Sequence, residues 1–186
     1  PPQLRKKAGA YMDALVIGAG GFVGSYLIQE LMSCGKAVGA TKLPHESIRI
    51  GGCEVFDLDL AKENDIRLLL QTHRPAQIYH LAAQSSVAVS WKDPELTVDV
   101  NIKGVLHLLE AIRSVEDYYP RILLVGSGEE YGYLRHGACP ISETEALHPG
   151  NLYAVTKACQ NMRLPKRCSL QHQEETQLRV HQERDP

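Results

Sequence analysis

The sequence lacks three features that each mark a distinct class of protein: an excess of charge of one sign, a long apolar run, and paired cysteines. Lys and Arg number 20 and Asp and Glu number 22, so the net charge of −2 gives no basic field for nucleic acid. No apolar run approaches the roughly 20 residues that a membrane-spanning helix needs. The five cysteines are scattered without a C-x-x-C spacing, which argues against a disulfide framework and a zinc site. These absences predict a cytoplasmic protein that binds neither nucleic acid, nor membrane, nor metal.

Short apolar runs alternate with helical patterns through most of the chain. Buried strands are expected at residues 13–17, 37–41, 53–56, 77–82 and 121–125. Helical spacing predicts helices over residues 22–32, 61–72, 95–115 and 151–162. Because strands and helices that alternate imply right-handed crossovers, the pattern predicts an α/β fold, a Rossmann-like doubly wound parallel sheet with helices on both faces.

The two ends of the chain do not share this pattern. Residues 1–11 carry basic side chains with no apolar segment behind them, so we expect no signal peptide there but an N-terminal extension ahead of a native start at Met12. Residues 163–186 contain four glutamines, mixed charges and no aromatic residue, and Pro165 would break a continuing helix. We therefore expect one domain over residues 12–162, followed by an irregular or disordered tail.

A glycine-rich segment, Gly18-Ala-Gly-Gly-Phe-Val-Gly24, follows the first expected strand and opens the first expected helix. Glycines let the backbone turn sharply and approach a pyrophosphate, which the N-terminus of the helix then stabilises. A glycine motif gains its meaning from this strand–turn–helix setting. The segment therefore predicts a dinucleotide-binding loop that includes Gly18, Gly21, Phe22, Val23 and Gly24.

The end of the second expected strand bears on the choice of cofactor. An acidic residue there would accept hydrogen bonds from a ribose 2′-hydroxyl, but the sequence has Thr41 and Lys42 instead. A hydroxyl and a cation suit a 2′-phosphate. This favours NADP over NAD, and the alternative for Lys42 is an ordinary solvated surface lysine.

Tyr153 and Lys157 form a Y-x-x-x-K pair on the last expected helix. Residues four apart share one face of a helix, so the ammonium can lie near the phenol. A nearby cation stabilises the phenolate, which lets the tyrosine exchange a proton near pH 7. Such a pair alone can be a solvated surface pair, and its position one element after the fifth strand of a dinucleotide fold gives it weight.

Ser127 ends the fifth expected strand, at the edge of a parallel sheet where ligands bind. Its hydroxyl can hydrogen-bond the substrate oxygen that Tyr153 protonates. Glu129 leaves three alternatives open: an acid/base group, a ligand for a sugar hydroxyl, or an exposed side chain. The sequence thus predicts Ser127, Tyr153 and Lys157 as catalytic residues, with Glu129 as a further candidate.

Three other positions carry expectations of a different kind. The His-Leu-Ala-Ala segment of residues 80–83 ends the fourth strand, and its small alanines allow a cofactor to pass closely. His80 is interpreted as a packed strand histidine, and Trp91 as a packing residue. Asn101 lies within a predicted helix, where Asn is not favoured, so it either bonds backbone or water near the active site or lies on a polar face.

Together these motifs resemble the extended branch of the short-chain dehydrogenase/reductase superfamily, the nucleotide-sugar epimerases, dehydratases and reductases. The resemblance covers residues 12–162 and rests on the G-x-x-G-x-x-G spacing, the H-L-A-A segment, Asn101 with Gly104, residues 127–132, and the Tyr/Lys pair. It implies that Asp57 and Leu58 lie against the adenine, although an exposed acidic turn is the alternative. The predicted cofactor contacts are then Gly18, Gly21, Phe22, Val23, Gly24, Thr41, Lys42, Asp57, Leu58, Leu81, Ala82, Ala83, Asn101, Tyr153 and Lys157.

Within this branch, the G-S-G-E-E-Y-G segment of residues 126–132 is similar to the G-S-S-E-E-Y-G of GDP-4-keto-6-deoxy-mannose reductases. GDP-mannose 4,6-dehydratases typically carry T-S-E or T-D-E there, which would make Glu129 their base, but Gly128 lacks the hydroxyl or acid. The resemblance therefore implies NADP-dependent reduction of a nucleotide-linked 4-keto-6-deoxy sugar. In that reaction Tyr153 gives the proton, Lys157 assists it and holds the ribose, and Ser127 orients the ketone. A dehydratase or epimerase is one alternative, and a non-catalytic NADP(H)-binding module is another.

Enzymes of this branch run to about 300 residues, twice the length of a typical domain, and their C-terminal part supplies the sugar pocket. This sequence stops soon after the Tyr/Lys helix, so we expect its C-terminal substrate domain to be missing. We expect the chain to bind NADP(H) but to lack most of its sugar site. The expected partners are a GDP-sugar and a second copy of the chain, in a homodimer formed through helices 95–115 and 151–162.

Overall fold

The computed structural model describes residues 12–48, 50–133 and 140–160. The expected N-terminal extension and the expected tail lie outside these residues. The chain divides into two compact units, Pro1–Val125 and Gly126–Pro186. The first unit contains the sheet and the glycine loop, and the second contains the segments that carry Ser127, Tyr153 and Lys157.

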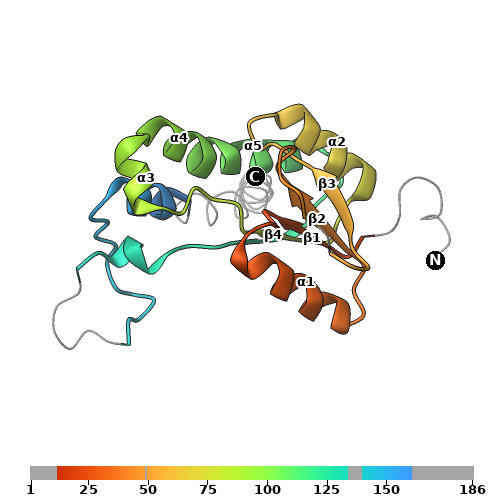
Figure 1. Cartoon of the computed structure of the whole chain (residues 1–186), viewed down its shortest axis with the longest axis horizontal. Helices are drawn as coiled ribbons and strands as arrows, with labels where there is room; N and C mark the ends of the chain where they lie inside the picture. The colour runs from red at the N-terminus through yellow and green to blue at the C-terminus, as the bar shows by residue number, and fades with distance from the viewer. Residues whose placement is uncertain (1–11, 49, 134–139, 161–186) are drawn as a thin grey trace, which may run out of the picture. The chain divides into compact units, whose positions relative to one another are not determined.

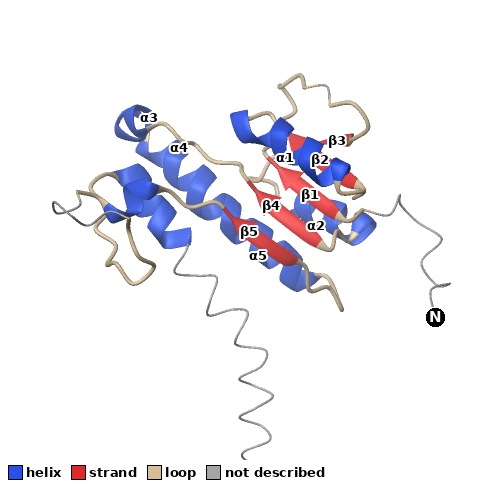
Figure 2. Cartoon of the chain, turned by 90° about the horizontal axis from the view of Figure 1, so that it is seen from below, coloured by secondary structure: helices blue, strands red, loops and turns tan. Residues whose placement is uncertain are grey.

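The first unit is built on a parallel five-stranded sheet with the order β3-β2-β1-β4-β5 (Figure 2). The strands are β1 (Ala14–Ile17), β2 (Val38–Lys42), β3 (Glu54–Asp57), β4 (Gln77–His80) and β5 (Arg121–Leu124). The chain moves outward from β1 to β3 and then returns to place β4 on the other side of β1. Ligands of open α/β sheets bind at such a reversal, beyond the carboxyl ends of the strands. The predicted fold is confirmed, with each strand within two residues of its expected bounds.

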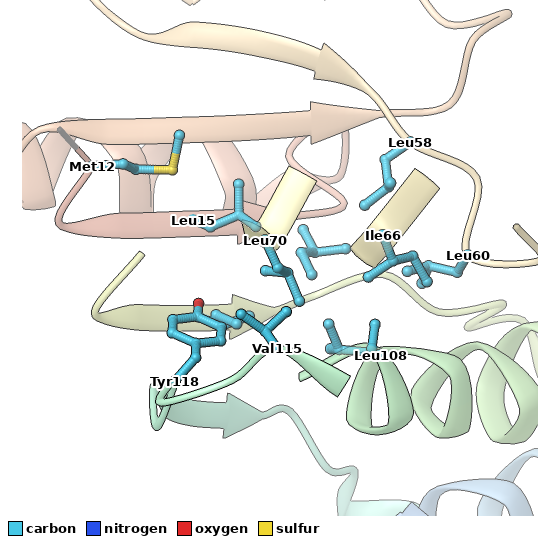
Figure 3. Packing of buried hydrophobic residues seen from close by; sticks show 12 residues of the cluster. Met12, Leu15, Leu58, Leu60, Ile66, Leu70, Leu108, Val115 and Tyr118 are labelled. Carbon is cyan, nitrogen blue, oxygen red and sulfur yellow. The ribbon is translucent and has the colours of Figure 1, made fainter. Parts of the chain in front are cut away.

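Alternate residues of β1 face opposite sides of the sheet, and each side has its own helices (Figure 1). Leu15 and Ile17 pack with α2 (Glu63–His73) and α5 (Gly104–Ser114), whereas Ala14 and Val16 pack with α1 (Phe22–Ser33). The face covered by α2 and α5 holds the larger apolar core, whose buried residues are drawn as sticks in Figure 3. This core is formed by Met12, Leu15, Ile17, Leu58, Leu60, Ile66, Leu70, Ile78, Leu108, Ala111, Val115 and Tyr118.

The helix expected over residues 95–115 consists of three consecutive segments. Helix α4 (Pro94–Val98) leads into a π-helical turn (Asp99–Lys103), which leads into α5. A separate short helix, α3 (Val87–Lys92), precedes them and was not predicted. The Asp93 side chain accepts a hydrogen bond from the N–H of Leu96. This bond caps the N-terminus of α4, so that α4 begins as a separate helix after α3.

The structure shows which side of helix α1 is buried, and it corrects the expectation for Trp91. Helix α1 lies where it was predicted, but its exposed face carries Phe22, Val23 and Tyr26, while Gly24, Ile28 and Leu31 face the sheet. Gly24 explains this orientation, because its missing side chain lets the helix approach the preceding loop closely. Trp91 is 68% exposed, so its interpretation as a packing residue was wrong. It lies beside Ser90, the residue that α3 buries.

The second unit contains a 3₁₀ turn (Gly128–Tyr131) and a helix over residues 152–160. The expected C-terminal end of that helix, at residues 161–162, lies outside the described residues. Among the described helices of the chain, none has the length and apolar character that a bilayer crossing requires. Among all the residues that the structure describes, no group of three or more His, Cys, Asp or Glu side chains could hold a metal ion.

Candidate active site

The glycine loop of the first unit requires glycine at two of its positions for different reasons. Gly18 has a φ of +82°, and a Cβ on it would lie 2.6 Å from the backbone nitrogen of Ala82. A Cβ on Gly24 would lie 2.3 Å from the carbonyl oxygen of Ala19. Gly18 therefore allows the loop to lie against the segment after β4, and Gly24 allows α1 to pack on the loop. Gly21 has more space, since the nearest atom to its Cβ position is 3.6 Å away.

The N-terminus of α1 is open in the way that a phosphate site requires. Gly21 is the N-cap residue, and no side chain of the described residues caps the helix. The first N–H groups of a helix and its dipole favour an anion at this end. The side chains of Phe22 and Val23, predicted to belong to this loop, are exposed, so these two residues can contribute their backbone amides to a ligand.

The residues expected to recognise a 2′-phosphate have separate roles in the structure. Thr41 is buried, and its hydroxyl accepts a hydrogen bond from the N–H of Gly18 at 3.3 Å. Its carbonyl accepts a second bond, from the N–H of Ala19 at 2.9 Å. Thr41 therefore holds the backbone of the glycine loop by two hydrogen bonds, and its hydroxyl is not presented at the surface.

Lys42 is paired with an acidic residue of the neighbouring strand. Its ammonium forms an ion pair with the carboxylate of Asp57, which is its register partner on β3. Lys42 is therefore not an ordinary solvated lysine, and a 2′-phosphate would have to compete with Asp57 for it. Leu58, expected beside the adenine, is buried in the core, and its N–H donates to the Lys42 carbonyl at 2.8 Å.

Asn101 fastens the segment that follows β4. It is fully buried in the π-helical turn, where its Oδ1 accepts from the N–H of Gln84 at 2.9 Å and its Nδ2 donates to the Gln84 carbonyl at 3.0 Å. Of the two interpretations of Asn101, the structure therefore shows bonding to backbone. Leu81 and Ala82 precede this point, and the N–H groups of both donate to the carbonyl of Ile17.

Gln84 itself was missed by the sequence reasoning. Its Nε2 donates to the buried Thr97 hydroxyl at 2.9 Å, and its Oε1 accepts from the N–H of Ser86 at 2.7 Å. Both its backbone and its side chain are thus held, which shapes the chain beyond Ala83. No sequence signal distinguishes Gln84 from any other polar residue that follows a strand.

Ser127, in the second unit, is the N-cap of the 3₁₀ turn. Its Oγ accepts from the N–H of Glu129 at 3.2 Å and from the N–H of Glu130. Among the described residues no acceptor takes its hydroxyl proton. A hydroxyl has two acceptor lone pairs and one proton, so this geometry leaves the proton for an outside acceptor such as a carbonyl oxygen.

Glu130 completes a capping box with Ser127 and was also missed. Its Oε1 accepts from the N–H of Ser127 at 2.7 Å, and the side chain is buried. A signal was present in the sequence, because Ser127-Gly-Glu-Glu130 has the S-x-x-E spacing of a capping box. Sequence reasoning weighed only Glu129, the exposed neighbour.

Asn151 joins Glu129 to the Tyr/Lys helix within this unit. Its Oδ1 accepts from the N–H of Ala154 at 2.9 Å and so caps the helix, while its Nδ2 donates to Glu129 Oε2 at 2.9 Å. Glu129 and Asn151 border a cavity of about 200 Å³. It is lined by Gly128, Glu129, Gly132, Tyr133, Gly150 and Asn151.

Tyr153 and Lys157 lie one turn apart on the helix of residues 152–160, and both are buried. Burial lowers the pKa of Lys157, because the surroundings disfavour its charged form, while the negative charge of Glu130 raises it. The ammonium also donates to Gln160 Oε1 at 3.5 Å. The predicted catalytic residues therefore all belong to the second unit, and the predicted cofactor residues, apart from Tyr153 and Lys157, belong to the first.

Comparisons with known sequences agree with these motifs. Residues 15–166 match the sequence model of the family described as GDP-mannose 4,6 dehydratase. The chain is 33% identical over 159 residues to the GDP-mannose 4,6-dehydratase of Vibrio cholerae, an alignment that covers 77% of this chain and 42% of that protein. It is 32% identical over 142 residues to the GDP-6-deoxy-D-mannose reductase of Pseudomonas aeruginosa, covering 76% and 42%. The chain thus spans less than half the length of these curated relatives.

Solved structures show the same fold. The UDP-glucose 4-epimerase of Thermus thermophilus, in complex with NAD, aligns with a TM-score of 0.73 and 32% identity over 82% of this chain and 49% of that one. RMD from Pseudomonas aeruginosa, complexed with NADPH, aligns with a TM-score of 0.64 and 30% identity over 80% and 46%. Sequence, fold and the arrangement of the site lead to one assignment: the chain belongs to the GDP-mannose 4,6 dehydratase family.

Proposed function

We propose that this chain is the cofactor-binding and proton-transfer part of an NADP-dependent reductase that acts on a GDP-linked 4-keto-6-deoxy sugar. The observation that carries the proposal is the Ser127 hydroxyl, whose lone pairs are engaged by two backbone N–H groups of the 3₁₀ turn. It is thereby set to donate its proton to a carbonyl oxygen. The chain's membership of the GDP-mannose 4,6 dehydratase family supports a nucleotide-sugar substrate, and the P. aeruginosa reductase is among the relatives of this chain.

The residues present fit a dinucleotide cofactor. Glycine is required at Gly18 and Gly24, and the N-terminus of α1 carries no side-chain cap from the described residues. The phosphates would be held by the amides of this loop, and the ribose by Lys157. When bound, NADPH supplies the hydride for the ketone carbon. Structures of relatives contain NAD in one case and NADPH in another, which is consistent with either cofactor.

The chain's own residues supply the proton. Ser127 holds the ketone oxygen, and the Tyr153 phenol gives it a proton as the carbon is reduced. The Lys157 ammonium stabilises the phenolate that remains on Tyr153. Lys157 is buried on the helix face it shares with Tyr153, so it acts at short range and with little screening by water.

A dehydratase is the second candidate, and a specific contact favours it. Glu129 borders the cavity of the second unit and is held there by Asn151 Nδ2 at 2.9 Å. A carboxylate fixed in this way can serve as the base that an elimination needs. Gly128, which supplies neither a hydroxyl nor an acid beside it, favours reduction.

Cofactor binding is tested on the chain itself. We expect saturable quenching or enhancement of nicotinamide fluorescence with NADPH, weaker binding of NADH, and a rise in melting temperature with NADPH. Gly24→Ala serves as the variant that disturbs the loop. Equal binding of NADH would refute the NADP preference, and absence of binding by either cofactor would refute the cofactor role.

The reaction class is tested in chimeras that restore a complete enzyme. Residues 12–160 of this chain replace the matching part of the P. aeruginosa reductase in one chimera and of the V. cholerae dehydratase in another. Reduction consumes one NADPH for each keto sugar converted, whereas dehydration of GDP-mannose would need the oxidised cofactor, which takes a hydride from the sugar and returns it, so that no net NADPH is formed or consumed. We expect turnover in the reductase chimera that Ser127→Ala abolishes. Activity in the dehydratase chimera alone, lost in Glu129→Gln, would decide for the second candidate.

A further inference from the structure

Glu130 is a buried carboxylate with a defined contact on the substrate-orienting serine. It is 2% exposed, and its Oε1 accepts from the N–H of Ser127 at 2.7 Å. Its backbone is tied as well, because its carbonyl accepts from the N–H of His148 at 3.0 Å. The charge is therefore held at one position in the unit and cannot swing into water.

Lys157 is the opposite charge buried in the same unit. It is 5% exposed; burial lowers its pKa, and the negative charge of Glu130 raises the pKa in opposition. Tyr153 lies one turn before it on the same helix, and Glu129 is exposed and bonded to Asn151. Ion burial is costly unless an opposite charge compensates it, and Glu130 is a buried carboxylate of the same unit that can supply this charge.

We propose that Glu130 is a positioning residue of this site: its one carboxylate holds the Ser127 backbone by a hydrogen bond and supplies the counter-charge for the Lys157 ammonium. The meaning of this link rests on the proposed function, in which Ser127 orients the ketone and Lys157 assists Tyr153. The link itself is a property of the folded chain. It ties the two groups that must act on one substrate oxygen to a single rigid side chain.

The two roles of Glu130 need different chemistry, which makes them separable. Holding the Ser127 N–H requires only an acceptor oxygen, and Glu130→Gln keeps one in nearly the same place. Compensating Lys157 requires a negative charge, which Glu130→Gln removes. Glu130→Ala removes both.

The test is an NMR titration of the full chain without cofactor, following the Ser127 amide and the Lys157 ¹³Cε signal. In the wild-type chain we expect both signals to respond to the protonation of the Glu130 carboxyl. In Glu130→Gln we expect the Lys157 titration to move to lower pH while the Ser127 amide stays near its wild-type position. Glu129→Gln, which removes an exposed charge from the same turn, is the matched control and should leave the Lys157 titration unchanged.

Each outcome decides the proposal. An unchanged Lys157 titration in Glu130→Gln reduces Glu130 to a turn cap and overturns the counter-charge role. A Ser127 amide that ignores the Glu130 titration overturns the positioning role. If Glu130→Gln does not fold, the wild-type titration decides alone. Since no cofactor or turnover is involved, failure of NADPH to bind refutes the proposed function and leaves this result standing.

Discussion

Replacing Asn101 with alanine removes both bonds that fasten the chain after β4. The amide of Asn101 is fully buried in the π-helical turn, and it pairs with the N–H and the carbonyl of Gln84 at 2.9 and 3.0 Å. Alanine favours helix more than asparagine does, so propensity alone predicts a small gain in stability. The expected result is the opposite, a clear loss.

The magnitude follows from the two backbone groups that lose their partners. A buried N–H or carbonyl left unsatisfied costs about 1–3 kcal/mol, and the pair therefore costs up to about 6 kcal/mol. The Gln84 groups are only part-buried, so water can reach them in the variant and reduce the loss. We expect the free energy of unfolding to fall by about 2–4 kcal/mol, a large share of the roughly 5–15 kcal/mol of a typical domain.

The assay is urea unfolding followed by circular dichroism, with Asn64→Ala as the matched control. Asn64 also lies in a helix and accepts a side-chain bond, from Arg67 at 2.9 Å, but it is exposed. We expect a change within about 0.5 kcal/mol for the control. A loss below about 1 kcal/mol for Asn101→Ala, or one no larger than that of Asn64→Ala, would refute the reasoning, because water would then replace the clamp at little cost.

Three further predictions address the loop, the cofactor and the buried lysine. Gly24→Ala places a Cβ 2.3 Å from a backbone oxygen, so it should lower the free energy of unfolding by about 1–3 kcal/mol. Gly21→Ala is the control, because the nearest atom to its Cβ position is 3.6 Å away, and it should change the free energy of unfolding much less. Urea unfolding compares the two variants. Asp57→Asn removes the carboxylate that pairs with Lys42 and so frees the ammonium for a 2′-phosphate. The affinity for NADPH relative to that for NADH, measured by fluorescence titration, should rise about two- to fivefold. An unchanged ratio would exclude Lys42 as the 2′-phosphate ligand. Burial lowers the pKa of Lys157 from its ordinary value of 10.5, so the unfolded chain binds the proton more tightly than the folded chain does. The free energy of unfolding should therefore rise as the pH increases from the folded-state pKa to 10.5. Unfolding of Lys157→Met over the same pH range should lack that rise.

The strands could be predicted from the sequence because each is short, buried and bounded by turn residues. The π-helical turn could not, because no residue type marks the point within residues 95–115 at which one turn holds an extra residue. Helix α3 was missed because six residues are too few to show a period. The buried face of α1 could not be read from apolar residues alone, because Phe22 and Tyr26 are exposed, whereas the close approach at Gly24 sets which side meets the sheet.

At the site, the sequence could supply residue types but not their partners. The glycine loop and the Tyr/Lys pair were found from spacing, which local geometry determines. Thr41 and Lys42 looked alike as surface groups, and only the parallel register of β2 with β3 shows that Lys42 meets Asp57. Glu130 was missed because adjacent glutamates read as equivalent, although one is buried and the other is exposed.

The contact between residues 132 and 148 has a consequence for how this part of the protein can vary. Gly132 has a φ of +62°, and a Cβ on it would lie 2.0 Å from the carbonyl oxygen of His148, so the two backbones touch. The adjacent bond from the His148 N–H to the Glu130 carbonyl closes the same point at 3.0 Å. Residues 130, 132 and 148 are thus held against one another by two neighbouring backbone contacts. A side chain at residue 132 would displace the His148 carbonyl and with it the bond to Glu130, so a substitution here would reach the buried carboxylate beside Ser127 although it touches no catalytic group.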